Sequence, residues 1–143
     1  MKVFTLLKIA LLAVTFVSCK KDKEDIACPI NRNSLAGSYL VTGISYKPSA
    51  ALPEQDFLGY MPDCSKDNLL RLNNDGTYVY LEGTNVCDPS DAGSGIWTVA
   101  GNNLQSDGTL NGTIASYDCK ALVYYLEDVL ADGDKMTFTI SRQ

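Results

Sequence analysis

Apolar and polar positions alternate most regularly near the end of the chain, where Met136, Phe138 and Ile140 are separated by threonines. A period of two is typical of a β-strand with one buried face. Shorter runs rich in β-branched and aromatic residues recur earlier, with turn residues between them. The pattern predicts strands at residues 35–47, 68–73, 77–82, 95–100, 103–106, 109–117, 121–127 and 136–141. The segment 48–63 is looser, with room for a short helical turn at 54–58.

A tight turn at Asn74-Asp75-Gly76 joins the second and third predicted strands. Asp-Gly favours a β-hairpin because the turn needs a positive φ, which Gly76 adopts without strain. A two-residue loop pairs Asn74 with Thr77, whereas a three-residue loop with a glycine bulge shifts the register by one residue. Either register brings Cys64 and Cys87, at the outer ends of the hairpin, close together.

Eight short strands, mostly joined by tight turns, predict an all-β protein. The segment 121–132 is ambiguous, because its leucines also have helical spacing, but the adjacent Tyr124 and Tyr125 favour a strand. Eight consecutive antiparallel strands are best satisfied by an up-and-down β-barrel, which leaves no free edge.

The first nineteen residues indicate export. Lys2 and Lys8 precede an uncharged apolar run at residues 9–17, which is shorter than the about 20 residues that a membrane-spanning helix needs. Ser18-Cys19, followed at once by charged residues, resembles the lipobox of bacterial lipoproteins, in which the cysteine is diacylated and becomes the first mature residue. Secretion without a lipid is the alternative.

These features predict a signal peptide at residues 1–18, a lipidated tether at 19–34 and one barrel domain at 35–143. The signal holds two of the 12 basic residues and none of the 17 acidic ones, so the mature chain carries a net side-chain charge of −7. This balance argues against a nucleic-acid partner, because phosphate binding needs clustered Lys and Arg. The expected location is the outer membrane, on its periplasmic or its exposed face, with the membrane contacted through the lipid on Cys19.

The cysteine count agrees with an oxidising compartment. With Cys19 modified, four cysteines remain, and an even count in an exported chain implies disulfides. Of the three possible pairings, the hairpin favours Cys64 with Cys87, which leaves Cys28 with Cys119. The spacings do not match a zinc motif and the chain has no histidine, so we expect no metal site.

Several short motifs occur in a characteristic order. They are Leu35-x-Gly37-x-Tyr39, Cys64-x-Lys66-Asp67-Asn68, Asn74-Asp75-Gly76-Thr77, Cys87 and Gly95-x-Trp97. This set resembles the lipocalin-like domains of Gram-negative envelope lipoproteins over about residues 35–142. The resemblance implies a small calyx-like barrel whose interior can hold an apolar ligand. It also implies that Arg142 crosses Tyr39 in a cation–π contact; a C-terminal charge in solvent is the alternative.

Residues suited to catalysis are sparse. Without histidine there is no His-based triad, and no serine lies in a nucleophile-elbow sequence. The paired carboxylates lie in or beside predicted turns, where Asp caps the backbone, so we expect them to be structural; they are Asp88 with Asp91, Glu127 with Asp128, and Asp132 with Asp134. We therefore expect a protein that is not an enzyme and needs no cofactor.

A binding role follows from the expected barrel. The candidate ligand-binding residues are aromatic: Tyr78, Tyr80, Trp97, Tyr125 and Phe138. Tyr78 and Tyr80 share one face of their strand and Val79 and Leu81 the other, and the pattern does not decide which face points inward. We expect a lipid-anchored protein that holds a small apolar or amphipathic molecule. The alternative is an interaction or inhibitor protein with a filled barrel, whose loops at 48–63 and 84–94 recognise an envelope protein or a glycan.

Overall fold

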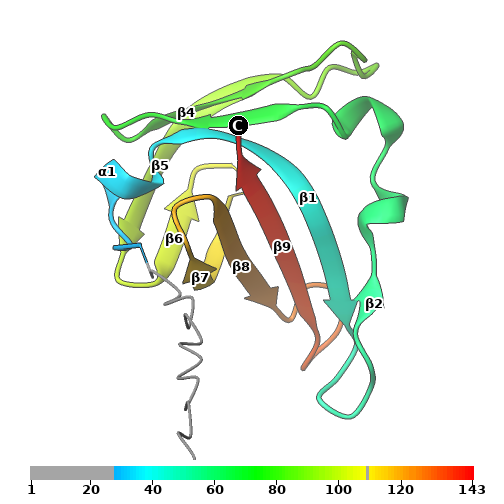
Figure 1. The fold of residues 1–143 in the computed structure, drawn as a ribbon. Coiled ribbons are helices and arrows are strands. Elements are labelled where there is room, and N and C mark those ends of the chain that lie inside the picture. The colour runs from blue at the N-terminus through cyan, green and yellow to red at the C-terminus, as the bar shows by residue number, and fades with distance from the viewer. Residues whose placement is uncertain (1–27, 109) are drawn as a thin grey trace, which may run out of the picture.

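The computed structural model describes residues 28–108 and 110–143; the predicted signal peptide and the lipid site at Cys19 lie outside them. The described chain forms a closed, eight-stranded, antiparallel up-and-down β-barrel, as the strand pattern predicts (Figure 1). The barrel strands are β1 (Gly37–Lys47), β3 (Leu69–Leu72), β4 (Thr77–Leu81), β5 (Gly93–Ala100), β6 (Asn103–Ser106), β7 (Gly112–Tyr117), β8 (Ala121–Glu127) and β9 (Lys135–Arg142). The shorter elements are α1 (Arg32–Leu35), β2 (Gln55–Asp56) and the 3₁₀ helices η1 (Leu58–Tyr60) and η2 (Asp63–Ser65).

Each barrel strand pairs with its neighbours in the sequence, and β9 closes the barrel against β1. The pairing of β1 is uneven. Its first residues, 37–40, pair with β3, whereas near its end only the two residues of β2 lie beside it on that side. The segment 48–63 lies beside this incompletely paired side of β1. The helical turn expected at 54–58 is wrong: residues 55 and 56 form β2, and the helical turns are η1, at 58–60, and η2, which begins at residue 63.

The β3–β4 hairpin adopts the three-residue register. Leu72 pairs with Tyr78 and Leu70 with Tyr80, which makes Asn74-Asp75-Gly76 the loop. Gly76 has a φ of 88°, a left-handed conformation that suits glycine. Asp75 accepts a hydrogen bond from the backbone N–H of Thr77 at 2.9 Å and fixes the turn.

A β-bulge in β1 decides which of its side chains point inward. Its register against β9 shifts between Val41 and Gly43. Before the bulge Tyr39 and Val41 contribute to the interior, and after it Ile44 does so instead. The extra residue thus changes the inward set from odd to even positions, which an uninterrupted alternation would not predict.

One end of the barrel is filled by a hydrophobic core. Trp97, Tyr39 and Leu35 are almost fully inaccessible there, together with aliphatic side chains from β3 and β6–β9. The turns at this end are short, and α1 packs against it. We call this the closed end. We call the opposite end the open end; there the strands are connected by the segments 48–68, 82–92, 107–111 and 128–134.

The packed part of the domain begins before Leu35, so the tether predicted to run to residue 34 extends too far. The backbone N–H of Cys28 donates to the carbonyl of Tyr117 at 3.0 Å, and Cys28 is buried. Asn31 caps α1 through a reciprocal pair of hydrogen bonds with Ser34. Leu35, the last residue of α1, is buried in the core of the closed end. The polar composition of residues 31–34 is typical of a tether, but the polar side chains of Asn31 and Ser34 cap α1.

Both predicted disulfides are present. Cys28 and Cys119, 91 residues apart, have Cα atoms at 5.3 Å, and Cys64 and Cys87, 23 residues apart, at 5.2 Å. The first bond attaches the start of the domain to the β7–β8 turn at the closed end. The second joins the segment before β3 to the β4–β5 loop at the open end.

Candidate functional site

The half of the barrel toward the open end encloses a cavity of about 500 Å³. This volume lies within the range of small-molecule sites, about 300 to 1,000 Å³. Its walls are mainly apolar and aromatic. They comprise Tyr39, Val41, Ile44, Met61, Pro62, Ser65, Asn68, Leu70, Tyr78, Tyr80, Asp91, Gly93, Gly108, Leu110, Tyr124, Phe138 and Ile140.

The tyrosines of β4 point inward. Tyr80 pairs with Leu70 of β3, and both line the cavity; residues directly opposite in an antiparallel pair share a face. The choice that the sequence left open is thus settled, with Val79 and Leu81 on the outer face. Across the cavity Tyr124 and Phe138 stack with their ring centroids 5.2 Å apart.

Three of the five candidate ligand-binding aromatics line the cavity: Tyr78, Tyr80 and Phe138. Trp97 does not, because it is only 1% exposed within the closed-end core, where its indole N–H donates to the carbonyl of Asn73. The sequence does not indicate whether an inward-facing tryptophan lies at the filled end of the barrel or at the hollow end.

Tyr125 also lies outside the cavity, and its neighbour Tyr124 takes the inward place. Adjacent strand residues face opposite sides, so only one of the pair can point inward. Tyr125 lies on the outer face, where the ammonium of Lys135 is 4.1 Å from its ring centroid. Alternation from Leu122, which is fully buried, identifies Tyr124 as the interior residue.

The cavity tyrosines are neutral at ordinary pH. Burial raises the pKa of Tyr124 and of Tyr78, and for Tyr78 the charge of Asp107 adds to the effect. Burial also raises the pKa of Tyr80, a rise that a hydrogen bond with Asn68 partly offsets. Their hydroxyl groups therefore serve as neutral hydrogen-bonding groups on an otherwise apolar wall.

A small polar cluster lies on the cavity wall near the second disulfide. Asp91 Oδ2 accepts a hydrogen bond from the hydroxyl of Ser65 at 2.6 Å and approaches the amide nitrogen of Asn68 at 3.4 Å. Ser65 and Asn68 are buried, while Asp91 as a whole residue is exposed. Asp91 was expected to cap a turn, but its carboxylate binds the side chain of Ser65 instead. The sequence signal for this contact is the position of Asp91 four residues after Cys87, because the Cys64–Cys87 bond brings that loop next to η2.

The loop that carries Asp91 is held by the residues before β3. Asp67 accepts hydrogen bonds from the backbone N–H and the hydroxyl of Thr84, both at 2.8 Å, and Asn68 accepts one from Gly83 N–H at 3.0 Å. Gly83 is required because a Cβ there would lie 2.3 Å from Asp67 Cγ. The Cys-x-Lys-Asp-Asn motif therefore fixes the β4–β5 loop at the open end.

The segment after β2 covers the incompletely paired side of β1. Phe57 donates its backbone N–H to the carbonyl of Ile44 at 2.8 Å, and its ring lies 5.0 Å from that of Tyr46. Beyond it, Met61 and Pro62 line the cavity. Loop residues rather than a ninth long strand thus form part of the cavity wall.

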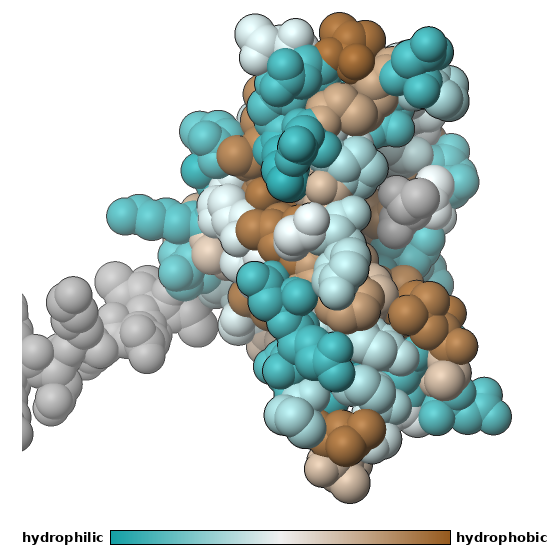
Figure 2. Space-filling view, turned by 90° about the vertical axis from the view of Figure 1, so that its right-hand side faces the viewer, coloured by the Kyte–Doolittle hydropathy of each residue, from teal (hydrophilic) through white to brown (hydrophobic). Residues whose placement is uncertain are grey.

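Five large apolar side chains are exposed on open-end segments: Leu52, Tyr60, Val86, Val129 and Leu130. Figure 2 views the side of the molecule that carries β2 and the 3₁₀ helices. There the hydrophobic side chains form separate groups among hydrophilic ones rather than one continuous patch.

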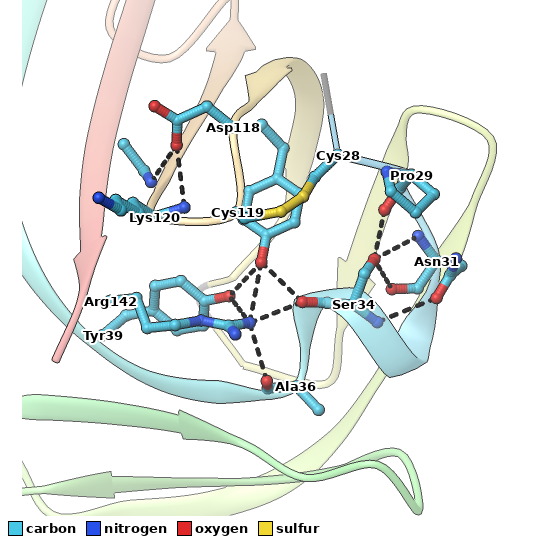
Figure 3. Close-up of a disulfide and its surroundings, with 12 residues drawn as sticks. Cys28, Pro29, Asn31, Ser34, Ala36, Tyr39, Asp118, Cys119, Lys120 and Arg142 are labelled. Carbon is cyan, nitrogen blue, oxygen red and sulfur yellow. Dashed lines mark hydrogen bonds between the residues drawn. A yellow bond between two sulfur atoms is a disulfide. The ribbon is translucent and has the colours of Figure 1, made fainter. Parts of the chain in front are cut away.

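At the closed end, Arg142 contacts Tyr39 as the resemblance implied. Its guanidinium carbon lies 5.5 Å from the Tyr39 ring centroid. One guanidinium nitrogen also lies within 3.1 Å of the Tyr39 and Tyr117 hydroxyls and the Ser34 and Ala36 carbonyls (Figure 3). Burial, with the hydrogen bond to Tyr117, raises the pKa of Tyr39 to about 12. Gly37 leaves room for this arginine, since a Cβ there would lie 3.0 Å from Arg142 Nε.

Two of the carboxylates expected to cap turns do so. Asp128 accepts from the backbone N–H of Gly133 at 2.6 Å. Asp134 is buried and accepts from the backbone N–H groups of residues 129–131 and from the Tyr46 hydroxyl. Burial acts to raise the pKa of Asp134, but these hydrogen bonds outweigh it and leave the pKa below its ordinary value.

Within residues 28–108 and 110–143, no group of His, Cys, Asp and Glu side chains is arranged to hold a metal ion. Nor does any helix in this part of the chain have the length and apolar character needed to cross a membrane. Comparison of the sequence with protein-family models and with curated proteins finds no match.

Proposed function

We propose that this chain is a lipid-anchored envelope binding protein that holds a small apolar or amphipathic molecule in its barrel. The anchor is the lipid expected on Cys19, and the location is the outer membrane, on its periplasmic or its exposed face. The protein acts by binding, without catalysis and without a cofactor.

The cavity of about 500 Å³ is the observation that carries this proposal. A packed barrel of this size buries its interior side chains against each other, and an unfilled apolar space forfeits those contacts. Aromatic and aliphatic walls with a few polar groups are typical of ligand sites. Tyr78, Tyr80 and Phe138 supply the aromatic wall, and Ser65 and Asn68 supply polar atoms at its edge.

Gly93 offers a way to plug the cavity. It pairs with Tyr80, so a side chain placed there points inward, and its Cβ would meet no atom within 4 Å. Ser94 is the matched control because it pairs with the outward-facing Val79 on the same strand and is exposed.

The test uses the full chain, purified from an exporting host. Native mass spectrometry and the fluorescence of the neutral apolar probe N-phenyl-1-naphthylamine measure bound molecules. We expect an adduct or probe binding in the wild type and in Ser94→Trp, and its loss in Gly93→Trp with an unchanged melting temperature. A wild-type protein that carries no adduct and binds no probe contradicts the proposal.

The alternative, a protein that recognises an envelope protein or a glycan through its loops, is favoured by the exposed apolar side chains of the open end. Tyr60 and Val86, 79% and 67% exposed, lie on the segments expected to make such contacts. That alternative expects a filled barrel, whereas only the closed end is filled. A partner that co-purifies with the wild type and with Gly93→Trp, but not with a Tyr60→Ser/Val86→Ser double variant, would support it.

A further inference from the structure

The cavity wall carries a negative charge. Among the described residues that line it, Asp91 alone is charged. Its Oδ2 is oriented by the Ser65 hydroxyl, 2.6 Å away, and by the amide of Asn68. Ser65 and Asn68 are buried, so their hydrogen bonds hold the carboxylate at a fixed place on the wall although Asp91 as a whole residue is exposed.

Aromatic rings line the same cavity as this carboxylate. Tyr80 shares the cavity with Asp91, and the negative charge of Asp91 contributes to the raised pKa of Tyr80, after burial and the opposing hydrogen bond with Asn68. Tyr78 lies on the same face of β4. The faces of tyrosine rings attract cations, and a neighbouring carboxylate adds to this attraction.

The connecting segments of the open end carry the same sign of charge. Residues 48–68, 82–92, 107–111 and 128–134 contain a single basic residue, Lys66, which pairs with Asp63. They contain eleven acidic residues: Glu54, Asp56, Asp63, Asp67, Glu82, Asp88, Asp91, Asp107, Asp128, Asp132 and Asp134. Lys47 and Lys135 lie at the strand ends beside these segments, so the open end has an excess of negative charge rather than a single sign. Such an excess concentrates cations.

We propose that the ligand is a cationic amphiphile, whose ammonium head contacts Asp91 and the Tyr78 and Tyr80 rings while its apolar part fills the aromatic cavity. This inference rests on the proposed binding function and adds the ligand's chemical class. An anionic amphiphile such as a fatty acid binds more weakly, because its carboxylate would meet Asp91 with no basic side chain among the described lining residues to pair with it.

The experiment compares three probes that share a decyl chain and differ in the head group: decyltrimethylammonium, decanol and decanoate. Each displaces N-phenyl-1-naphthylamine from the full-length protein at low ionic strength, below its micelle concentration. One charge pair at a partly exposed site is expected to give about tenfold tighter binding of the ammonium than of the carboxylate, with the alcohol between them.

Asp91→Asn keeps the shape and an acceptor oxygen for Ser65 but removes the charge. We expect it to reduce the difference between ammonium and carboxylate to less than about threefold, while decanol affinity stays the same. Asp88→Asn is the control. It makes the same change of net charge in the same loop, at a residue that does not line the cavity, and the discrimination should persist.

Decanoate binding as tightly as decyltrimethylammonium would overturn the inference and leave the proposed function standing. A cation preference that survives Asp91→Asn would overturn the assignment to Asp91. Failure of the wild type to bind the reporter or any of the probes is the different result that counts against the binding function itself.

Discussion

The two ends of this barrel are built from the same eight strands and differ in almost every other respect. At the closed end the connections are tight turns, the core contains Trp97 and Tyr39, and Arg142 bonds to hydroxyl and carbonyl oxygens. At the open end the connections are longer, and the interior is a cavity with Asp91 on its wall. The packed core and the cavity thus occupy different parts of one sheet. Under the proposed function, stability and binding can each change with limited effect on the other.

The two disulfides provide the largest test of this division. In the chain-entropy model, a bond that closes 91 residues contributes about 4.5 kcal/mol and one that closes 23 residues about 3.5 kcal/mol. We therefore expect Cys28→Ala/Cys119→Ala to lower the free energy of unfolding more than Cys64→Ala/Cys87→Ala does. Urea denaturation of the two double variants measures the difference.

Ligand binding should respond in the reverse order. Loss of Cys64–Cys87 frees the loop that carries Asp91 and should weaken probe binding, whereas loss of Cys28–Cys119 should leave the affinity of the folded fraction unchanged. If the closed-end variant is the more stable of the two and the poorer binder, the functional division between the ends is wrong.

Large aromatic residues give a second comparison. Trp97→Ala removes a fully buried side chain from the closed end and is expected to cost about 4 kcal/mol. Phe138→Ala removes a half-buried ring that already borders the cavity, so its cost is expected to be about 2 kcal/mol. Chemical denaturation measures both.

Ile96→Ala is the control for Trp97→Ala, because Ile96 is the preceding residue on β5 and is 60% exposed. Its cost should be within about 0.5 kcal/mol of zero. Equal costs for Trp97→Ala and Phe138→Ala would show that the cavity wall is as important to stability as the closed-end core.

Acid titration gives the smallest expected effect. The pKa of Asp134 at the open end lies below its ordinary value of 3.8 because the hydrogen bonds outweigh burial. The pKa of Asp118 at the closed end is lowered by backbone hydrogen bonds from Ala121 and Lys120. A lowered folded-state pKa stabilises the protein above the unfolded value, and that contribution disappears as the pH falls through the folded-state pKa.

Asp134→Asn should therefore lower the melting temperature at pH 7, and the gap to the wild type should narrow below about pH 4. Asp118→Asn should have a smaller effect, because Asp118 is exposed whereas Asp134 is buried. Thermal melts across this range check both variants. A constant gap between wild type and Asp134→Asn would contradict the linkage.

Local patterns in the sequence predicted the strands, the hairpin and, with Cys19 assigned to lipid, both disulfides. Each of these depends on neighbours in sequence: alternation in β9, the glycine at position 76, and the distance from that turn to Cys64 and Cys87. The contact of Arg142 with Tyr39 was available only through resemblance to a family, since the two residues are 103 positions apart.

The candidate site was predicted less completely, because it depends on where the barrel stops being filled. Trp97 and Tyr125 have the composition of ligand contacts, but one lies in the closed-end core and the other on the outer face. Asp91 has the sequence context of a turn residue, but its carboxylate accepts a hydrogen bond from Ser65, which is 26 positions away. The bulge after Val41 likewise has no local signal, because it arises from pairing with β9.

Both ends of the described chain lie at the closed end of the barrel. Cys28 bonds to Tyr117, and the backbone N–H of the final residue, Gln143, donates to the carbonyl of Ser38. If Cys19 carries lipid, the anchored segment joins the barrel at its closed end, opposite the mouth. A reporter fused after Gln143 would leave the entrance unobstructed, because the mouth lies at the other end of the barrel.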